Sequence, residues 1–270
     1  MLREPNGQTE LDEVAERLGA HLRAAEPVGW GDARATHRLS LTDGRSFAAR
    51  RFAGSEPRAR VERIGRLMAR LADADLPVPS PTIVETAGGS WLLTAWMDGE
   101  TGAGWLGDPE RARHLADRMG RLARRLRAVD LDDADLRGQL LADRHERNTM
   151  ERIAFVHGDF APVNVVMEAG GEIGALLDFD HAGSGPALLD VAWWGWVVRH
   201  HHPEAWTAAW PTFLRAAGLG LGRIEARLHE LALRRLADRA AAADDAEAER
   251  RWLERLAAAQ AWRVPGGQAT

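Results

Sequence analysis

The chain has 270 residues, 45% of them hydrophobic, and its 35 basic and 40 acidic side chains give a formal net charge of −5. It contains no cysteine, and every basic residue is an arginine, so disulfides, thiolate metal sites, cysteine nucleophiles and lysine Schiff-base chemistry are excluded. The mildly acidic balance argues against a general nucleic-acid-binding protein.

Membrane-spanning and secretory segments are not evident in the sequence. The longest stretch without a charged residue or histidine, Thr86 to Met97, is shorter than the roughly 18 residues that a membrane helix needs. The first ten residues lack the apolar core of a signal peptide. We therefore expect a soluble, cytoplasmic protein that binds neither nucleic acid nor a membrane, while its oligomeric state stays open.

The first hundred residues predict helices combined with a small sheet. Apolar residues at helical spacing from Leu11 to Leu22 predict an opening amphipathic helix, and a second helix is expected over Glu56–Ala74. The Asp43-Gly44 pair is typical of a hairpin turn, and Gly88-Gly89 predicts another. Strands are expected at these turns and after the proline-rich break at 76–81, namely Leu39–Leu41, Ser46–Phe52, Ile83-Val84 and Trp91–Met97.

The remainder of the chain is predicted to be mostly helical. Asp108-Pro109-Glu110 is a helix start, with a capping carboxylate followed by proline in the first turn. Apolar residues from Leu115 to Val129 continue at helical spacing, and helices are expected from residue 191 onward. We place a hinge near Met97–Gly99, which predicts an N-terminal nucleotide-binding lobe over residues 1–97 and a C-terminal catalytic, substrate-binding lobe over residues 98–270.

The segment that carries chemistry lies between residues 155 and 180. Two apolar, strand-like pieces flank a Gly170-Gly171 turn, with a polar loop before the first piece and Asp178-Phe179-Asp180 after the second. A hairpin of this kind brings Asp159, Asn164 and Asp178 to one end. Two carboxylates and an amide form an oxygen-rich site that suits Mg²⁺. Zinc is excluded because there is no cysteine and His157 has no histidine partner near it in sequence.

Phosphoryl transfer requires this set of groups. One carboxylate orients or accepts the proton of the acceptor hydroxyl, and a second carboxylate with an amide oxygen holds the metal that bridges the phosphates. The spacing from Asp159 to Asn164 is that of the kinase catalytic loop, Asp-x-x-x-x-Asn. Asp178-Phe179-Asp180 stands where kinases carry Asp-Phe-Gly.

The ordered motifs resemble the aminoglycoside phosphotransferase family, which groups with choline kinase and other small-molecule kinases. They are His157-Gly-Asp-(x)4-Asn164, Leu176-Leu-Asp-Phe-Asp180 and Gly183-Ser-Gly-Pro-Ala-Leu-Leu-Asp-Val-Ala192. The resemblance covers most of the chain. It implies an α+β, bilobal protein-kinase-like fold, with a small antiparallel-sheet N-terminal lobe and a larger, mostly helical C-terminal lobe.

The resemblance also implies roles for the residues of the second lobe. Asp159 would be the catalytic base or orienting carboxylate, and Asn164 and Asp178 would bind Mg²⁺. Asp180 would contact a second metal or only solvent and backbone. His157 would brace the catalytic loop, and Asp190 would support it from the following helix.

In the first lobe the family carries a strand lysine that grips the nucleotide phosphates. Arg50 occupies that place here, and Arg51 is the alternative on the opposite strand face. Arginine suits phosphate geometry, so the grip can survive the exchange. The acidic partner is expected to be Glu62, with Glu56 or a solvated helix face as alternatives. Nucleotide contacts are also implied for Ala48, Trp96 and Met97, under a degenerate covering loop at Gly29-Trp30-Gly31.

The function implied is the transfer of the γ-phosphate of ATP or GTP, with Mg²⁺, to a hydroxyl of a small molecule. The acceptor expected first is an antibiotic, such as an aminoglycoside or another natural product, that phosphorylation inactivates. A metabolic acceptor such as choline, homoserine or a sugar is the second enzyme interpretation. A non-catalytic, nucleotide-binding pseudokinase is the rival from another class.

Four other patterns have simpler interpretations. His200-His201-His202 is expected to be an exposed helix end, because adjacent helical residues point in different directions. The arginines between Arg111 and Arg127 are expected on a solvated helix face. Most tryptophans after residue 190 are expected in the core, with one or two left for a substrate platform. The acids between Asp244 and Glu254 would either grip a polyamine antibiotic, as in the family, or pair with neighbouring arginines on a surface helix, which is favoured.

Overall fold

The computed structural model describes residues 5–28, 36–52, 56–130, 152–220, 222 and 224–262. The chain divides into two units, Met1–Asp98 and Gly99–Thr270, so the division lies one residue beyond the predicted one. None of the helices within the described ranges is long and apolar enough to cross a bilayer.

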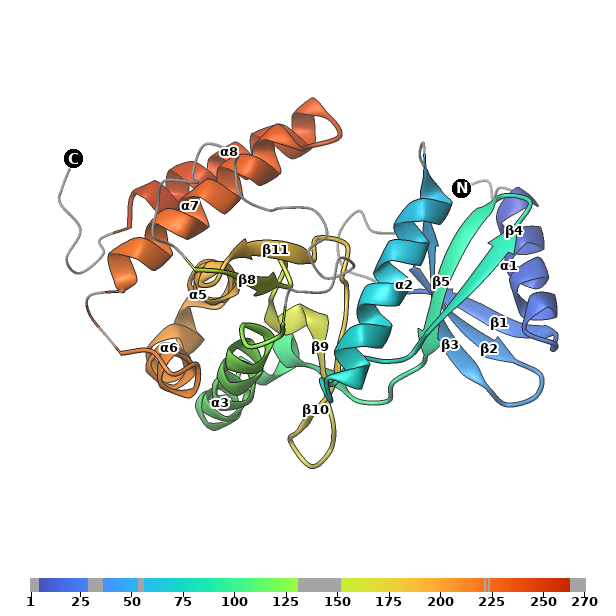
Figure 1. The fold of residues 1–270 in the computed structure, drawn as a ribbon, viewed down its shortest axis with the longest axis horizontal. Helices are drawn as coiled ribbons and strands as arrows, with labels where there is room; N and C mark the ends of the chain where they lie inside the picture. Colours follow the sequence, from blue (N-terminus) through green and yellow to red (C-terminus); the bar gives the residue numbers. More distant parts are fainter. Residues whose placement is uncertain are drawn as a thin grey trace. The chain divides into compact units, whose positions relative to one another are not determined.

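The first unit is a five-stranded antiparallel sheet with two helices (Figure 1). The strand order is β1-β2-β3-β5-β4, and each neighbouring pair is antiparallel. The elements of this unit are α1 (Pro5–Arg17), β1 (Leu22–Pro27), β2 (Thr36–Leu41), β3 (Ser46–Phe52), α2 (Pro57–Asp73), β4 (Pro81–Thr86) and β5 (Gly89–Ala95).

The opening helix is shorter than the apolar spacing predicts. It ends at Arg17, and Gly19 adopts a φ of +75°, a left-handed conformation in which a helix terminates readily at glycine. Leu22, which we expected on the helix, instead begins β1 and pairs with Leu41 of β2. The hairpin turn at Asp43-Gly44 is present as predicted, with Gly44 at a φ of +90°.

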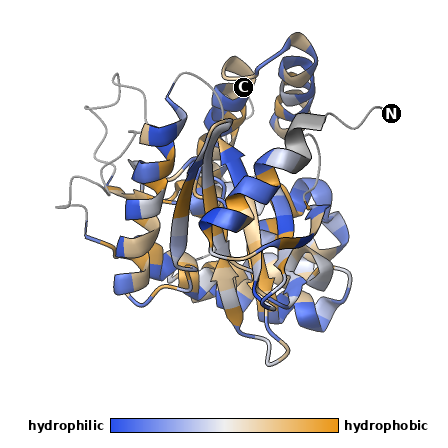
Figure 2. Cartoon of the chain, turned by 90° about the vertical axis from the view of Figure 1, so that its right-hand side faces the viewer, coloured by the Kyte–Doolittle hydropathy of each residue, from blue (hydrophilic) through white to orange (hydrophobic). Residues whose placement is uncertain are grey.

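The two helices of the first unit cover opposite faces of its sheet (Figure 1). Leu11 and Val14 of α1 join one apolar cluster with strand residues that share a face, including Trp91 and Leu93 of β5. On the other face, Ile83 of β4 lies against Gly65 of α2. The hydropathy colouring in Figure 2 shows hydrophobic residues along these strands and hydrophilic residues on the outer side of α1.

The second unit is mostly helical, and its described strands form two small sheets, β10-β9-β6 and β11-β8. Asp108 caps its first long helix, as predicted, by accepting hydrogen bonds from the backbone N–H groups of Glu110 and Arg111. The elements are β6 (Glu100–Thr101), the 3₁₀ helix η1 (Gly102–Trp105), α3 (Pro109–Leu126), β8 (Ile153–Val156), the 3₁₀ helix η3 (Pro162–Asn164), β9 (Val165–Met167), β10 (Ile173–Leu176), β11 (Gly183–Pro186), α5 (Leu189–His201), α6 (Pro203–Ala216), α7 (Glu225–Ala241) and α8 (Ala246–Gln260).

The core of the second unit surrounds α5, which is apolar on nearly every side and contacts α6 and α7. Trp193, Trp194 and Trp196 of this helix and Trp210 of α6 are buried, which confirms that most of the seven tryptophans after residue 190 belong to the core. The side chain of Trp194 stacks on Phe213 of α6, with ring centroids 3.9 Å apart. This packing fixes α5, the helix that supports the candidate site.

Replacing Gly120 by alanine is expected to lower the free energy of unfolding by about 2 kcal/mol. Gly120 lies where α3 crosses α6, and a Cβ there would stand 2.5 Å from the backbone oxygen of Phe213. That clash outweighs the gain of up to about 1 kcal/mol in helix propensity. Urea unfolding followed by circular dichroism measures the change. Gly170→Ala, which meets no atom within 4 Å, is the matched control and should leave the stability nearly unchanged.

Candidate active site

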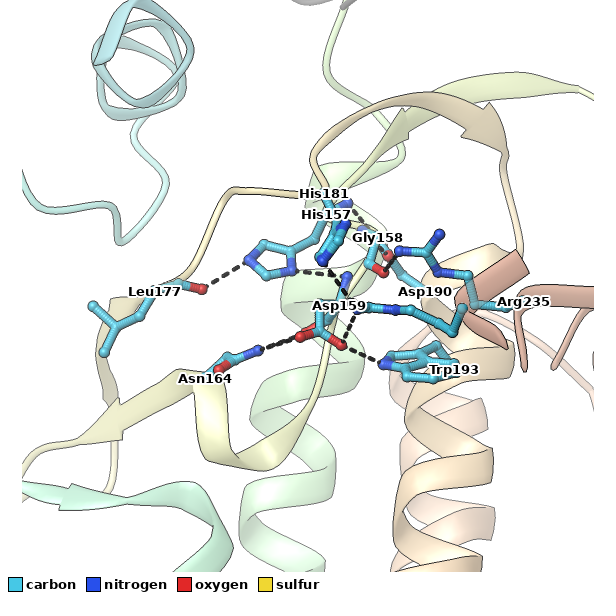
Figure 3. A network of polar contacts seen from close by, with 10 residues as sticks. His157, Gly158, Asp159, Asn164, Leu177, His181, Asp190, Trp193 and Arg235 are labelled. Carbon is cyan, nitrogen blue, oxygen red and sulfur yellow. Dashed lines mark hydrogen bonds and ion pairs between the residues drawn. The ribbon is translucent and has the colours of Figure 1, made fainter. Parts of the chain in front are cut away.

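The backbone of the loop that follows β8 is bound by a buried carboxylate, that of Asp190. The backbone N–H groups of His157 and Gly158 donate to the two oxygens of Asp190, at 2.8 and 2.9 Å (Figure 3). Gly158 adopts a φ of +75°, which a residue with a side chain rarely does. Asp190 lies in the first turn of α5 and is 2% exposed. Burial raises the pKa of Asp190, an effect that His157, the two N–H groups and Arg235 oppose.

The imidazole of His157 joins the loop that follows β8 to the end of β10. Its Nε2 lies 2.9 Å from the backbone oxygen of Leu177, and its Nδ1 accepts from the N–H of Asp159 at 3.3 Å. The ring meets Phe179 edge to face, with centroids 4.9 Å apart. His157 is fully buried, so these contacts fix the distance between the loop and the segment that carries Asp178.

The carboxylate of Asp159 is oriented by three residues. One oxygen, Oδ1, accepts from the indole Nε1 of Trp193 at 2.8 Å and lies 2.9 Å from Nη2 of Arg239 (Figure 3 shows the former). The other oxygen, Oδ2, lies 3.4 Å from Nδ2 of Asn164. The side chain of Asp159 is 24% exposed. Its Oδ1 is therefore engaged by donors from α5 and α7, and its Oδ2 lies on the side of Asn164.

Asn164 and Asp178 supply the other oxygens of the predicted set. The Nδ2 group of Asn164 donates to the backbone oxygen of Asp159 at 2.8 Å, which directs the amide oxygen away from that contact. Its own backbone oxygen accepts from the N–H of Leu177 at 2.8 Å, so Asp178 follows directly on a residue bonded to Asn164. The β9–β10 hairpin thus brings Asp159, Asn164 and the start of Asp178-Phe179-Asp180 to one end.

The backbone of Asp178 is in a sparsely populated conformation, with a φ of +64°. Aspartate tolerates this region better than most residues, yet it still costs of order 1 kcal/mol. Asn164 and Asp178 together provide only oxygen ligands, which fits Mg²⁺. Within the described ranges, no group of three histidine, aspartate or glutamate side chains is arranged to hold a metal ion.

Two arginines of α7 that sequence reasoning missed also contact the loop. Nη2 of Arg235 donates to the backbone oxygen of Gly158 at 2.7 Å (Figure 3), and Arg239 pairs with Asp159. Nη1 of Arg239 also lies 2.6 Å from Nε2 of His181. Arg235 continues the apolar spacing of Leu228 and Leu231. An arginine within a core-facing stripe is the signal that could have identified it.

Burial and the mutual proximity of these groups lower the pKa values of Arg235 and His181. Burial and then Arg239 lower the pKa of Arg235 to about 10, so Arg235 remains a cation at neutral pH. Burial, Arg239 and Arg235 lower the pKa of His181 to about 4, so its ring is neutral there. The loop that carries Asp159 therefore has two guanidinium groups beside it, and His181 adds no third positive charge.

In the first unit, the strand register separates Arg50 from Arg51. Arg51 pairs with Trp91 across the sheet, on the face that α1 covers, and its Nε donates to Glu10 of α1 at 2.9 Å. Arg50 pairs with Leu92 and so lies on the opposite face. Its Cζ is 5.5 Å from the ring centroid of Phe52. Arg51 is thus a structural residue on the α1 face, whereas Arg50 lies on the other face of the sheet.

The other predicted nucleotide residues lie near Arg50 in the sheet or at the end of β5. Ala48 shares the face of Arg50, because it occupies the same strand two residues earlier. Trp96 follows β5, and the Cζ of Arg38 lies 4.5 Å from its ring centroid. Arg38, opposite Ala48 in the register, is a cation that sequence reasoning overlooked. Met97 comes next and is half-buried, whereas Gly29-Trp30-Gly31 lies outside the described residues.

Glu62 does not show the expected ion pair with Arg50 among its contacts. It accepts from Nε of Arg58 at 2.8 Å, one turn earlier on α2, and both side chains are exposed. The hydrogen bond from Arg58 lowers the pKa of Glu62. The contact matches the alternative of a solvated helix face, which Arg58 and Glu62 share.

A model of a known protein family matches most of the chain. It is described as "Phosphotransferase enzyme family", and it matches residues 24–153 and 131–231. The chain belongs to this phosphotransferase family. The predicted resemblance is therefore confirmed, and the loop, the hairpin and the strand residues described above are those of a phosphotransferase.

Solved structures share the fold of this phosphotransferase at low sequence identity. A GDP complex of aminoglycoside 2′-phosphotransferase-IIIa has a TM-score of 0.71 and 13% identity over 96% of this chain and 99% of the other. A gentamicin complex of APH(2″)-IIa has a TM-score of 0.66 and 12% identity over 95% and 97%. Macrolide 2′-phosphotransferase MphH from Brachybacterium faecium has a TM-score of 0.62 and 20% identity over 93% and 98%. No curated protein matches the sequence of this chain.

These similarities confirm the predicted α+β, kinase-like fold class. The structure of the phosphotransferase also shows where the histidine run at 200–202, the arginines of α3 and the acids of α8 lie. His200 and His201 end α5, and the arginines of α3 form pairs such as Arg121–Asp117 on an exposed face. Asp245 caps α8, and Glu247 pairs with Arg251 at 3.1 Å. The acids of α8 therefore follow the surface-helix interpretation.

Proposed function

We propose that this phosphotransferase transfers the γ-phosphoryl group of ATP or GTP, with Mg²⁺, to a hydroxyl of a small molecule, with Asp159 as the proton acceptor. The observation that carries the proposal is the contact between Asp159 and Asn164 at the end of the β9–β10 hairpin. Asp178 lies at the same end, shortly after β10. A carboxylate for the acceptor proton beside an amide and a second carboxylate for the metal is the arrangement that phosphoryl transfer requires.

In the proposed reaction, the acceptor hydroxyl lies at Oδ2 of Asp159. The hydroxyl proton passes to this oxygen as the acceptor oxygen forms a bond to the γ-phosphorus, and the bond from that phosphorus to the leaving diphosphate oxygen breaks. The products are the phosphorylated acceptor and ADP or GDP. Trp193 and Arg239, through Oδ1, keep the carboxylate in the orientation that presents Oδ2 to the hydroxyl.

Asn164 and Asp178 would hold Mg²⁺, and Asp180 is the further candidate. When bound, the ion neutralises charge on the phosphates during transfer. The chain's own contribution is to fix these ligands. Asn164 is oriented by its Nδ2 contact with the backbone of Asp159, and Asp178 is fixed by the hairpin and by its unusual φ of +64°.

Replacing Arg50 by alanine is expected to raise the KM for ATP by about 10-fold or more with a smaller change in kcat, because a charge-assisted hydrogen bond to phosphate contributes about 1.5–3 kcal/mol. Steady-state kinetics at varied ATP concentration measures the effect. Arg51→Ala is the matched control, since Arg51 contacts Glu10 and the backbone oxygen of Gly88. It should leave the KM unchanged. A raised KM in Arg51→Ala alone would contradict the assignment of Arg50.

The acceptor class that we propose is a hydroxylated natural product, such as an antibiotic, whose phosphorylation inactivates it and gives resistance. The family and the solved structures of aminoglycoside and macrolide phosphotransferases support this class. A metabolic acceptor is the alternative enzyme function. The pseudokinase alternative is disfavoured by the family match and by the contacts around Asp159.

A mass-spectrometric transfer screen tests the proposed function. The purified protein, with ATP or GTP, is incubated with hydroxylated antibiotics and metabolites, with and without Mg²⁺. We expect one compound class to gain a phosphoryl group only when Mg²⁺ is present. Nucleotide binding with neither transfer nor hydrolysis in the presence of Mg²⁺ would support the pseudokinase alternative instead.

A further inference from the structure

The side of Asp159 that faces α7 is positively charged. Arg239 is paired with Asp159, and its side chain is only 16% exposed. Arg235, one helical turn earlier, is 6% exposed and contacts the loop at Gly158. The Nε atoms of both arginines are buried and have no hydrogen-bond partner within the described part of the chain. Two cations from one helix therefore lie against a loop whose exposed acid is Asp159.

Aromatic rings from α5 and α8 surround the guanidinium of Arg239. Its Cζ lies 5.6 Å from the ring centroid of Trp193 and 5.7 Å from that of Trp252. Trp252 is half-buried, and the Cζ of Arg255 lies 4.6 Å from its centroid. The ring faces hold Arg239 by cation–π attraction and restrict its position. A second cation thus approaches the same cluster from α8.

Three of the five acids between Asp244 and Glu254 have partners of their own at α8. Asp245 accepts from the backbone N–H of Ala248 as the cap of α8, at 2.7 Å. Glu247 and Glu254 lie in exposed pairs with Arg251 and Arg250 of the same helix. An acceptor with several ammonium groups would bring like charges toward Arg239, which raises the free energy of its complex.

We infer that Arg239 determines acceptor specificity, and that the acceptor carries an oxyanion, a carboxylate or a phosphate ester, close to the hydroxyl that is phosphorylated. This inference rests on the proposed function. The Nε of Arg239 is buried, but Nη1 and Nη2 each carry two N–H donors, of which one on each contacts His181 and Asp159, respectively. The remaining donors match an oxyanion, and an acceptor bound there places its neighbouring hydroxyl beside Asp159.

Three matched acceptor panels test the inference by mass-spectrometric transfer with Mg-ATP and Mg-GTP. One panel contains hydroxy acids and sugar acids, the second contains sugar phosphates, and the third contains aminoglycosides with several ammonium groups. We expect product from an anionic panel and none from the aminoglycosides. The first two panels distinguish a carboxylate from a phosphate ester as the recognised group.

Arg239→Gln should then raise the KM for the anionic acceptor by about 10- to 100-fold, the range expected for a charge-assisted hydrogen bond, and lower kcat less. Arg239→Lys should recover part of the loss. Arg234→Gln is the matched control, because Arg234 lies on the same helix in an exposed pair with Glu230 at 2.5 Å. Its KM should equal that of the unmodified protein. Thermal melting of each variant identifies any that fails to fold.

Hydrolysis of Mg-ATP with water as acceptor separates this inference from the proposed function. The inference is overturned if the aminoglycosides are the substrates, if Arg239→Gln retains the KM for the anionic acceptor, or if neither anionic panel gives product while hydrolysis that depends on Asp159 persists. Absence of both transfer and hydrolysis in the unmodified protein would instead overturn the proposed function, and the inference with it.

Discussion

Replacing Asp159 by asparagine is expected to lower the rate of phosphoryl transfer by about 10²- to 10⁴-fold, the usual contribution of a positioned general base. Asparagine keeps an oxygen that can accept from the indole of Trp193 and from Arg239, which now contact Oδ1 at 2.8 and 2.9 Å. It loses the ability to take the hydroxyl proton. The side chain stays in place, so the loss should fall on kcat, with little change in the KM for the nucleotide.

Single-turnover transfer, measured by quenched reaction and mass spectrometry, gives this rate directly. Asp117→Asn is the control, because Asp117 lies on the exposed face of α3 and pairs with Arg121. Urea unfolding should show that Asp159→Asn loses no more than about 1.5–3 kcal/mol of stability, the contribution of one ionic hydrogen bond. A transfer rate equal to that of the unmodified protein would show that Asp159 is not the base.

Replacing Asp190 by alanine should have the largest effect on stability, a loss of about 3–5 kcal/mol in the free energy of unfolding. Asp190 is 2% exposed and accepts from two backbone N–H groups. Alanine leaves both donors buried without a partner, and it removes one of the negative charges near Arg235. The loop that carries Asp159 loses its support, so transfer should fall as well.

Urea unfolding followed by tryptophan fluorescence measures the stability change. Asp190→Asn is the informative second variant: its amide oxygen can accept from one N–H group, but its NH₂ group would face the other donor. Its stability should therefore fall between those of Asp190→Ala and the unmodified protein. Asp117→Ala, on the exposed face of α3, should change stability by less than about 0.5 kcal/mol. An Asp190→Ala protein as stable as this control would contradict the structural role.

The parts of the site that lie close together in sequence are the parts that the sequence predicted. Four residues lie between Asp159 and Asn164, and a short hairpin with a Gly-Gly turn carries the chain to Asp178, so local geometry alone places these groups together. The helix start at Asp108 and the turn at Asp43-Gly44 are equally local, and both are present. Each depends on backbone preferences that act within a few residues.

The features that the sequence did not reveal depend on packing between distant segments. Arg239 lies far from Asp159 in the sequence, and only the packing of α7 on α5 brings the two side chains together. The choice between Arg50 and Arg51 required the strand register and the face covered by α1. The opening helix was predicted too long, because the apolar spacing continues through Leu22 although Gly19 ends the helix before it.

The N-terminal part of α5 holds the loop that carries Asp159 at two points. Asp190 binds the backbone at His157 and Gly158, and Trp193, three residues later on the same side of the helix, binds the carboxylate of Asp159. Backbone and side chain of the loop are thus aligned by a single rigid element. One residue inserted just before Asp190 would rotate the helix by about 100° relative to the preceding strand. Both contacts would be lost together. The segment between β11 and α5 therefore tolerates substitutions far better than insertions or deletions.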